Sequence, residues 1–191
     1  TKVYERQSFE SVFFGLLQIH STNLQGMRRT ADGASGRAFF NQQANYYNAA
    51  SAIKSGNYVD DAAAVTFLSN MFLERDGESM AHYFRTLSEL LDYVDSFGKI
   101  EIMRMPFLVQ LTNVAPSPEA KLRERYARIV RSVLSSAELH LIFLYCVAPE
   151  GVALRLMVER YALLENYDAS HIVPIEVKAK FVSLAAFGKR G

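Results

Sequence analysis

Hydrophobic residues recur with a helical period along almost the whole chain. The longest uninterrupted pattern covers residues 126–147, which contain no Gly or Pro and are apolar on most sides of a helical projection. This length is well beyond what a strand needs, so the pattern predicts an α-helix. A helix that is apolar on most sides belongs in the middle of a bundle. We therefore predict an all-α fold in which a single bundle packs around a long central helix over residues 120–147.

The same period predicts six or seven helices in total. Before the central helix we expect helices over residues 3–27 and 37–54, a helix start at Asp60 and Asp61, a break at Asp76 and Gly77, and a helix from there to Phe97. After it we expect a stop at Pro149, Glu150 and Gly151 and helices over residues 152–166 and 174–187. Residues 99–113 fit either a short helix or an extended segment bent at Pro106.

Local signals also predict where helices begin and end. Ser117 is expected to be an N-cap residue, because Pro118 then takes the first helical position and Glu119 lies in the first turn. Gly98 and Gly56 are expected to follow the C-terminal ends of the helices before them.

Two of the predicted helices carry polar residues on one stripe. On the central helix the stripe lies within about sixty degrees and consists of Arg128, Arg131, Ser135 and Glu138. On the helix that ends at Phe97, spacings typical of one helical face group His82, Arg85 and Glu89.

The stripes have two interpretations. In the structural one they pair with each other, with Arg131 near Glu89 or Glu138 near Arg85, and removing one partner costs about 3–5 kcal/mol. In the functional one a cleft for acid–base chemistry or anion binding is formed by the candidate catalytic residues His82, Arg85, Arg131 and Glu138. The sequence favours the structural interpretation and leaves the other open.

The composition is that of a globular protein. The chain has 191 residues, of which 50% are hydrophobic and 21% charged, and its formal net charge is +1. This length favours one domain, residues 1–191. A near-neutral chain has no electrostatic reason to bind nucleic acid, so no such partner is expected. Cys146 lies in an apolar run, which predicts a buried, inert thiol in a reducing compartment.

Motifs of common enzyme classes are absent from the sequence. The histidines show no metal-ligand spacing, so no metal and no other cofactor is predicted, and no small-molecule ligand is inferred. There is no phosphate-binding loop, nucleophile elbow or zinc-protease motif. Defence ribonucleases carry an Arg followed a turn or more later by a His, whereas His82 precedes Arg85 and lies too close to it. His20 is expected to be a core histidine.

Three sequence blocks resemble one protein family. They are FESVFFGLLQIH near the N-terminus, HYFRTL…LLDYVD in the middle, and RSVLSSAELHLIFLYCV…G…ERYALLEN further on. Their patterns are FF-x-LL-x-x-H, H-Y-F-R, and R-x-x-x-S-x-x-E-L followed by a Gly and E-x-Y. Together they resemble the phage abortive infection proteins of bacteria. The resemblance covers most of the chain in scattered blocks, and its specificity comes from the order of the three.

The resemblance implies bacterial antiviral defence by an effector or sensor that acts through protein interaction or conformational switching. A protein partner or self-association is therefore expected. The longest apolar run of this chain is broken by His140, so no segment is predicted to span a bilayer. Family members, however, often carry transmembrane helices before the first block. The resemblance thus implies that the chain is the soluble part of a longer, membrane-anchored protein, in the cytoplasm at the inner face of the inner membrane.

A second function, from a different class, also stays open. It is a small helical nuclease or other enzyme that uses the region of His82, Arg85 and Glu138. A concave pocket that converges on His82 would favour this enzyme. A filled core in which the charges pair with one another would favour an interaction protein.

Overall fold

The computed structural model describes residues 2–28, 33–54, 61–98, 117–167 and 180–188, and within them the fold is all-α, as predicted. The α-helices are α1 (Lys2–Gly26), α2 (Arg37–Lys54), α3 (Asp61–Phe72), α4 (Glu78–Ser96), α6 (Pro118–Val133), α7 (Ser136–Val147) and α8 (Val152–Arg160). A π-helical turn (Leu73–Gly77) joins α3 to α4, and 3₁₀ turns cover Pro149–Gly151 and Leu184–Phe187. No strand occurs in the described part of the chain.

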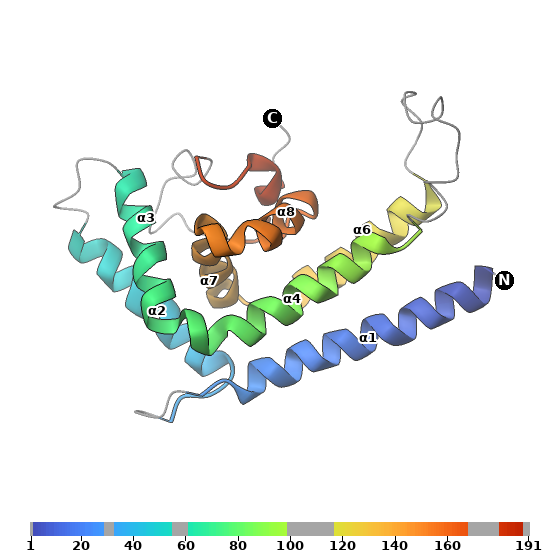
Figure 1. Cartoon of the computed structure of the whole chain (residues 1–191), viewed down its shortest axis with the longest axis horizontal. Helices are drawn as coiled ribbons and strands as arrows, with labels where there is room; N and C mark the ends of the chain where they lie inside the picture. The colour runs from blue at the N-terminus through green and yellow to red at the C-terminus, as the bar shows by residue number, and fades with distance from the viewer. Residues whose placement is uncertain (1, 29–32, 55–60, 99–116, 168–179, 189–191) are drawn as a thin grey trace.

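Helices that are distant in sequence lie side by side in the structure (Figure 1). The long helices α1 and α4 run next to each other, and α6 packs on α4. At one end of this layer α2 and α3 pack together. The shorter helix α7 stands in the middle, in contact with α2, α3 and α8. The predicted central element is therefore present, but only its second half occupies the centre.

Burial explains why α7 takes this place. Its side chains are buried on every side, and the buried apolar set is Leu139, Leu141, Ile142, Phe143, Leu144 and Cys146. Each fully buried Leu, Ile or Phe side chain contributes about 1.5–3 kcal/mol relative to an exposed one, which favours the position with most neighbours. The Cys146 thiol is buried as predicted, and burial raises its pKa.

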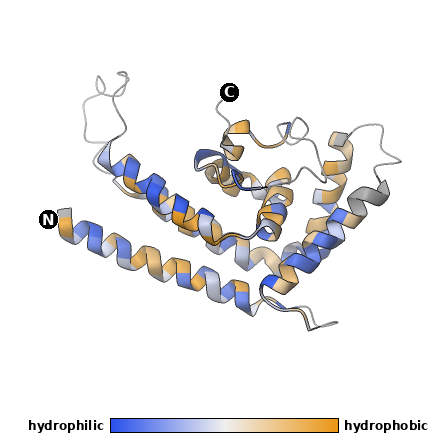
Figure 2. Cartoon of the chain, turned by 180° about the vertical axis from the view of Figure 1, so that it is seen from behind, coloured by the Kyte–Doolittle hydropathy of each residue, from blue (hydrophilic) through white to orange (hydrophobic). Residues whose placement is uncertain are grey.

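The long N-terminal helix α1 is hydrophobic on more than one side. Apolar residues recur along its whole length (Figure 2). Phe9 and Phe13 are buried where α1 meets its neighbours, whereas Val12, Phe14 and Ile19 are exposed. A surface helix normally confines its apolar residues to the buried stripe. The outer surface of α1 therefore keeps apolar side chains in contact with solvent.

The prediction of one continuous helix over residues 120–147 is wrong. Two helices, α6 and α7, meet there at an angle of 112°. At the junction Ser135 has an extended backbone (φ −81°, ψ 162°), its side chain accepts from the backbone N–H of Glu138, and the Glu138 carboxylate accepts from the backbone N–H of Ser135. This reciprocal capping box satisfies N–H groups at a helix start, so it favours a new helix over continuation of the old one.

The predicted break at Asp76 and Gly77 is also wrong. The chain stays helical through the π turn, and Gly77 has helical dihedrals (φ −56°, ψ −45°). Asp76 is buried and accepts a hydrogen bond from the hydroxyl of Tyr47 on α2. A π turn contains one extra residue, which here turns Asp76 inward. This tertiary contact outweighs the local tendency of Asp-Gly to end a helix.

The helix ends near the chain's middle follow the prediction. The Ser117 side chain accepts a 3.1 Å hydrogen bond from the backbone N–H of Ala120, and Pro118 takes the first helical position. Gly98 follows α4 with a φ of +74°, in the left-handed region that glycine adopts at little cost. Both predictions depend only on residues close in sequence, and the structure confirms them.

The C-terminal part departs from the prediction. The helix predicted over residues 152–166 ends as α8 at Arg160, and turns follow in which Ala162 has a φ of +48°. Of the helix predicted over residues 174–187, the described part contains only the 3₁₀ turn Leu184–Phe187. The predictions for Gly56 and for residues 99–113 lie outside the described residues.

Candidate functional site

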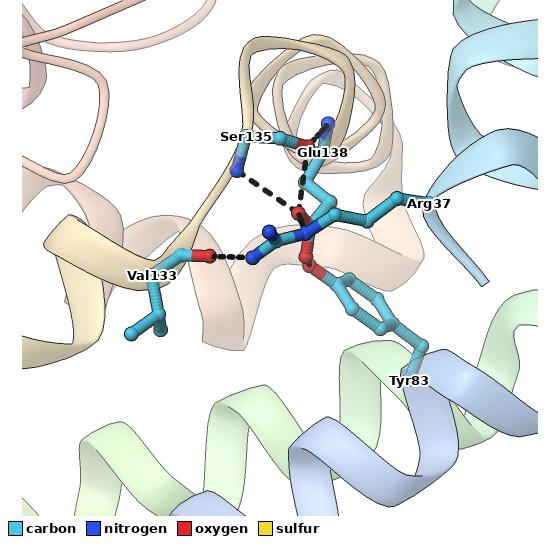
Figure 3. Close-up of polar contacts among 5 residues, drawn as sticks. All are labelled: Arg37, Tyr83, Val133, Ser135 and Glu138. Carbon is cyan, nitrogen blue, oxygen red and sulfur yellow. Dashed lines mark hydrogen bonds and ion pairs between the residues drawn. The ribbon is translucent and has the colours of Figure 1, made fainter.

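A buried carboxylate, Glu138, lies where α2, α4 and α7 meet (Figure 3). Its side chain is 1% exposed. The Tyr83 hydroxyl on α4 donates a 2.9 Å hydrogen bond to Glu138 Oε1. Ser135 donates to Oε2 from its backbone N–H at 2.9 Å and from its hydroxyl at 2.6 Å. A buried carboxylate without such donors costs several kcal/mol, so these three hydrogen bonds make its burial tolerable.

Arg37, the first residue of α2, supplies the positive charge. Its Nε lies 3.8 Å from Glu138 Oε2, and its Nη2 donates a 2.8 Å hydrogen bond to the carbonyl oxygen of Val133 (Figure 3). Val133 is the last residue of α6, so this bond satisfies a carbonyl group that has no partner within its own helix. One side chain thus joins α2 to both sides of the α6–α7 break. We call Glu138, Tyr83, Ser135 and Arg37 the Glu138 cluster.

Electrostatics keep Tyr83 in its donating form. Burial and the neighbouring Glu138 carboxylate raise the pKa of Tyr83 well above its usual value. A phenol that does not ionise keeps its proton for the hydrogen bond to Glu138. Tyr83 therefore remains a hydrogen-bond donor over the physiological pH range.

His20, on α1, is a buried neighbour of this cluster. Its side chain is 3% exposed, and its ring centroid lies 4.6 Å from that of Tyr83. His20 Nδ1 lies 3.2 Å from the hydroxyl oxygen of Thr86 on α4. Burial lowers the pKa of His20 to about 4, against an opposing effect of Glu138, so the ring is neutral at pH 7. His20 is a core histidine, as predicted, but one next to a charged group.

A pocket of about 390 Å³ opens beside His20. Its apolar wall is formed by Phe14, Leu17, Leu24 and Val133. Its polar lining comes from Gln18, His20, Ser21, Arg37 and Glu138. The pocket thus combines one charged pair, one neutral histidine and an apolar wall in the space between α1, the start of α2 and the α6–α7 break.

The two predicted polar stripes do not face each other. His82, Arg85 and Glu89 are exposed on α4, on the side away from the interior. Glu138 pairs with the cluster described above rather than with Arg85. The predicted contact of Arg131 with Glu89 is not formed either. The expected pairing of the stripes is therefore wrong, because the helix break turns Glu138 away from the residues of α6.

Arg131 instead lies against the turn after α8. Its Nη1 donates a 3.0 Å hydrogen bond to the carbonyl oxygen of Ala162 and also contacts the Glu165 carboxylate. Its Nη2 lies 3.9 Å from Glu124. Arg128, the neighbouring stripe residue, is exposed. The observed contacts give Arg131 a role in holding the chain after α8.

His82 lines a separate, more open hollow of about 630 Å³. The other lining residues are Thr22, Asn23, Gly26, Met27, Arg28 and Ser79. Neither Arg85 nor Arg131 nor Glu138 lines this hollow. The four candidate catalytic residues are thus not brought together in one cavity.

The sequence pattern identifies Glu138 and its neighbour Ser135 but not the two contacting groups from other helices, Tyr83 and Arg37. Tyr83 is the direct neighbour of His82 in the H-Y-F-R block, so the block contains the residue that contacts Glu138, although the helical stripe points to His82 and not to Tyr83. The position of Arg37 is the one sequence feature that points to its role. A cation at a helix N-terminus is locally unfavourable, so Arg37 is expected to have a negatively charged partner elsewhere in the fold. Nothing in the sequence places His20 beside Glu138, since that contact depends on how α1 packs.

Comparison with protein families decides the identity. A family model described as "Putative phage abortive infection protein" matches residues 75–172, just over half of the chain. The chain belongs to this family. The predicted resemblance is thereby confirmed. Comparison with curated proteins and with solved structures found no match.

The abortive infection family match begins in the π turn and runs through α4, α6, α7 and α8. Tyr83, Ser135 and Glu138 lie inside the matched region, whereas His20 and Arg37 lie outside it. The region that defines the family therefore contains the buried carboxylate and its direct donors. The N-terminal helices supply the remaining walls of the pocket.

The described residues also bear on the metal and membrane expectations. Within the residues that the structure describes, no group of three or more His, Cys, Asp or Glu side chains is placed to hold a metal ion. Over the same residues, no single helix is long and apolar enough to cross a membrane; α6 and α7 reach that length and composition only together, as a pair bent by 112°.

Proposed function

We propose that this abortive infection protein acts in phage defence through a protein contact that changes how its helices pack. Membership in the family supports the defence role. The observation that carries the mode of action is the Glu138 cluster, in which an exposed Arg37 reaches a buried carboxylate. Polar contacts of this cluster hold α2, α4, α6 and α7 to one another. A partner that binds at Arg37 therefore acts on four helices at once.

The contact of Arg37 with the cluster is weak enough to be exchanged. Its distance of 3.8 Å from Glu138 exceeds that of a hydrogen bond, and the Arg37 side chain is 60% exposed. Only the Arg37 end of the pair is exposed, so the pair contributes somewhat more than the about 0–1 kcal/mol of a fully exposed one, and the hydrogen bond to Val133 adds about 1.5–3 kcal/mol. Glu138 keeps its hydrogen bonds to Tyr83 and Ser135 when Arg37 leaves, so the buried charge stays satisfied. Two arrangements a few kcal/mol apart are what a binding-driven switch requires.

In this proposal infection supplies a protein that binds beside Arg37 and releases α2 from the α6–α7 break. The released helices then contact a cellular target or a second copy of the chain, and the infected cell stops growing. The complete protein faces the cytoplasm and is held at the inner membrane by segments outside this chain. No metal, cofactor or nucleic acid takes part.

The enzyme alternative has no supporting observation in the described residues. His82 and Arg85 are exposed on α4, whereas Glu138 is buried and turned toward Tyr83. A shared reacting centre requires groups within hydrogen-bond reach of one substrate. We therefore propose no second function.

The test is to challenge a susceptible bacterium that expresses the complete gene with a panel of phages. Plaque numbers should fall for some phages, and the infected cells should stop growing. Arg37→Gln removes the charge that joins α2 to the helix break, so it should release the switch and slow growth without phage. Arg128→Gln is the matched control, because Arg128 is exposed on α6; it should protect like the natural protein.

Two results would contradict the proposal separately. Unchanged plating of every phage by the natural protein would remove the defence role. Full protection and normal growth with Arg37→Gln would remove the switch and leave the defence role in place.

A further inference from the structure

The pocket beside His20 contains a buried nitrogen without a partner. Among the described residues, nothing hydrogen-bonds to His20 Nε2, although this atom is inaccessible to solvent. A buried polar group that stays unsatisfied costs about 1–3 kcal/mol. Because His20 lines the pocket and its Nδ1 is held against Thr86, Nε2 is the ring nitrogen left for a bound group, which reaches it when a neighbouring side chain of the lining moves aside.

The neighbouring hydrogen bonds determine which ring nitrogen carries the proton. The Thr86 hydroxyl donates its single proton to the carbonyl oxygen of Tyr83 at 3.1 Å. The oxygen of Thr86 then accepts from His20, and this arrangement assigns the ring proton to Nδ1. The other nitrogen, Nε2, therefore has a free lone pair. His20 is thus an acceptor that calls for an N–H or O–H donor.

Arg37, a second polar group at the pocket, is a donor and therefore calls for an acceptor. The Arg37 guanidinium uses Nη2 for the carbonyl of Val133 and points Nε at Glu138. A guanidinium has five N–H groups, so donors remain on its exposed side. The Glu138 carboxylate also lines the pocket, which disfavours an anion there, and its own oxygens already accept hydrogen bonds. The pocket therefore favours an uncharged ligand with one donor and one acceptor.

The walls and the rim of the pocket indicate how the rest of that ligand is shaped. Leu17 and Leu24 form apolar wall, and at the mouth Phe14 and Val133 are apolar and exposed. The helix that provides most of this lining has no Asp, Glu, Lys or Arg between residues 11 and 27. Exposed apolar rims around a pocket are typical of sites for an apolar anchor side chain of a protein partner. A volume of about 390 Å³ lies at the small end for ligand pockets, which suits one residue of a peptide.

We infer that this pocket binds one apolar residue of a partner protein, with the residue's backbone N–H donated to His20 Nε2 and its backbone carbonyl accepting from Arg37. The side chain of that residue lies between Leu17, Leu24 and Val133. This inference rests on the proposed function, which requires a protein contact beside Arg37, and it names the chemistry that the contact recognises.

The first experiment uses nuclear magnetic resonance of the imidazole nitrogens and two defined probes. In the free protein Nδ1 should carry the proton and Nε2 should be bare. N-acetyl-leucinamide should shift the Nε2 resonance as it is titrated in. Its backbone N-methylated analogue lacks the donor and should bind about tenfold more weakly, as expected when a buried acceptor is left unpaired. A protonated Nε2, or equal binding of the two probes, would overturn the inference.

The second experiment fills the pocket without touching the Glu138 cluster. Ser21 is exposed and lines the pocket, so Ser21→Trp should abolish the effect of N-acetyl-leucinamide on His20. Ser11→Trp is the matched control, since Ser11 is exposed on the same helix and does not line the pocket. Probe binding that survives Ser21→Trp would place the ligand elsewhere. Tighter binding of adenine than of N-acetyl-leucinamide would show that the pocket selects a base and not a peptide.

These results are independent of the phage challenge. Phage protection without probe binding would overturn the peptide pocket and leave the proposed function standing. Probe binding without phage protection would leave the peptide pocket standing and overturn the proposed function.

Discussion

The hydroxyl of Tyr83 donates a 2.9 Å hydrogen bond to Oε1 of Glu138, 55 positions further along the chain. Both residues are buried, so each satisfies a group that water cannot reach. Glu138 also forms the capping box that starts α7. The local start of one helix and its contact with another thus depend on the same carboxylate.

This shared role predicts unequal costs for the two partners. Tyr83→Phe removes one of several donors to Glu138 and should lower the free energy of unfolding by about 1–2 kcal/mol. Glu138→Ala removes the carboxylate half of the capping box and leaves the hydroxyls of Tyr83 and Ser135 without their buried acceptor, so it should cost about 3–5 kcal/mol. Urea unfolding followed by circular dichroism measures both. Glu89→Ala, on the exposed face of α4, is the control and should change little; a cost for it equal to that of Glu138→Ala would contradict this ranking.

Acid should destabilise the protein through His20. Its folded pKa of about 4 lies below the ordinary value of 6.5 because the ring is buried. Between those values the unfolded chain binds a proton that the folded chain does not, so stability falls as the pH is lowered. From pH 7 to pH 5 this amounts to about 2 kcal/mol. Tyr83 and Thr86 of α4 contact the ring, and Glu138 of α7 and Arg37 of α2 line the same pocket; of these groups only Glu138 raises the pKa of His20.

The measurement is the loss of unfolding free energy between pH 7 and pH 5 in the natural protein and in His20→Gln. The variant has no ring to protonate, so its loss should be smaller by about 2 kcal/mol. Other titrating groups contribute equally to both proteins and cancel. Identical losses would mean that His20 titrates in the folded state as it does in a free peptide.

Sequence patterns captured the helices and most of their ends, because these depend on neighbours along the chain. The cap at Ser117 and the glycine at Gly98 are examples. The break inside residues 120–147 had a local signal as well, Ser135 followed three residues later by Glu138. The apolar pattern on both sides of it outweighed that signal. The π turn at Asp76 had none, because Tyr47 lies on another helix.

The candidate site was less predictable for the same reason. Glu138 stood out as an ionisable residue in an apolar stretch, and the structure buries it. Its partners Tyr83 and Arg37 come from helices whose packing the sequence does not state. The prediction instead paired residues that share a helical projection. That projection assumes one straight helix, whereas the chain turns by 112° between α6 and α7, so residues on the two helices do not share a face.

Two glycines should respond to alanine in opposite ways. A Cβ on Gly151 would lie 2.0 Å from the carbonyl oxygen of Tyr145 and 2.9 Å from the Cα of Cys146. These are backbone atoms at the end of α7, so Gly151→Ala should cost at least about 3 kcal/mol. A Cβ on Gly15, in the middle of α1, meets nothing within 4 Å. Gly15→Ala should therefore stabilise the helix by about 0.5–1 kcal/mol.

Thermal unfolding of the two variants beside the natural protein provides the measurement. The melting temperature should fall for Gly151→Ala and rise for Gly15→Ala. A neutral Gly151→Ala would show that the turn after α7 has room to move. A destabilising Gly15→Ala would show that a side chain or partner lies against this part of α1.

Arg131 should matter for the turn after α8 and not for a catalytic centre. It donates to the carbonyl oxygen of Ala162, whose positive φ marks a conformation that needs support, and it contacts Glu165. Hydrogen bonds from charged groups contribute about 1.5–3 kcal/mol, so Arg131→Ala should destabilise by about 2 kcal/mol. Glu165 is half-exposed, and Glu165→Gln should therefore cost less than about 1 kcal/mol.

Hydrogen exchange separates this role from a functional one. In Arg131→Ala the amide protons of Glu165 and Tyr167, which donate to the carbonyls of Ala162 and Leu164 within the turn, should exchange faster, while those of α4 keep their protection. Arg128→Ala, on the exposed side of α6, should leave both regions unchanged. If Arg131→Ala abolished phage protection with normal stability and normal exchange, Arg131 would be a contact residue for a partner. If protection is lost together with the order of the turn, the turn after α8 is the element that the defence function requires, and Arg131 acts by holding it in place.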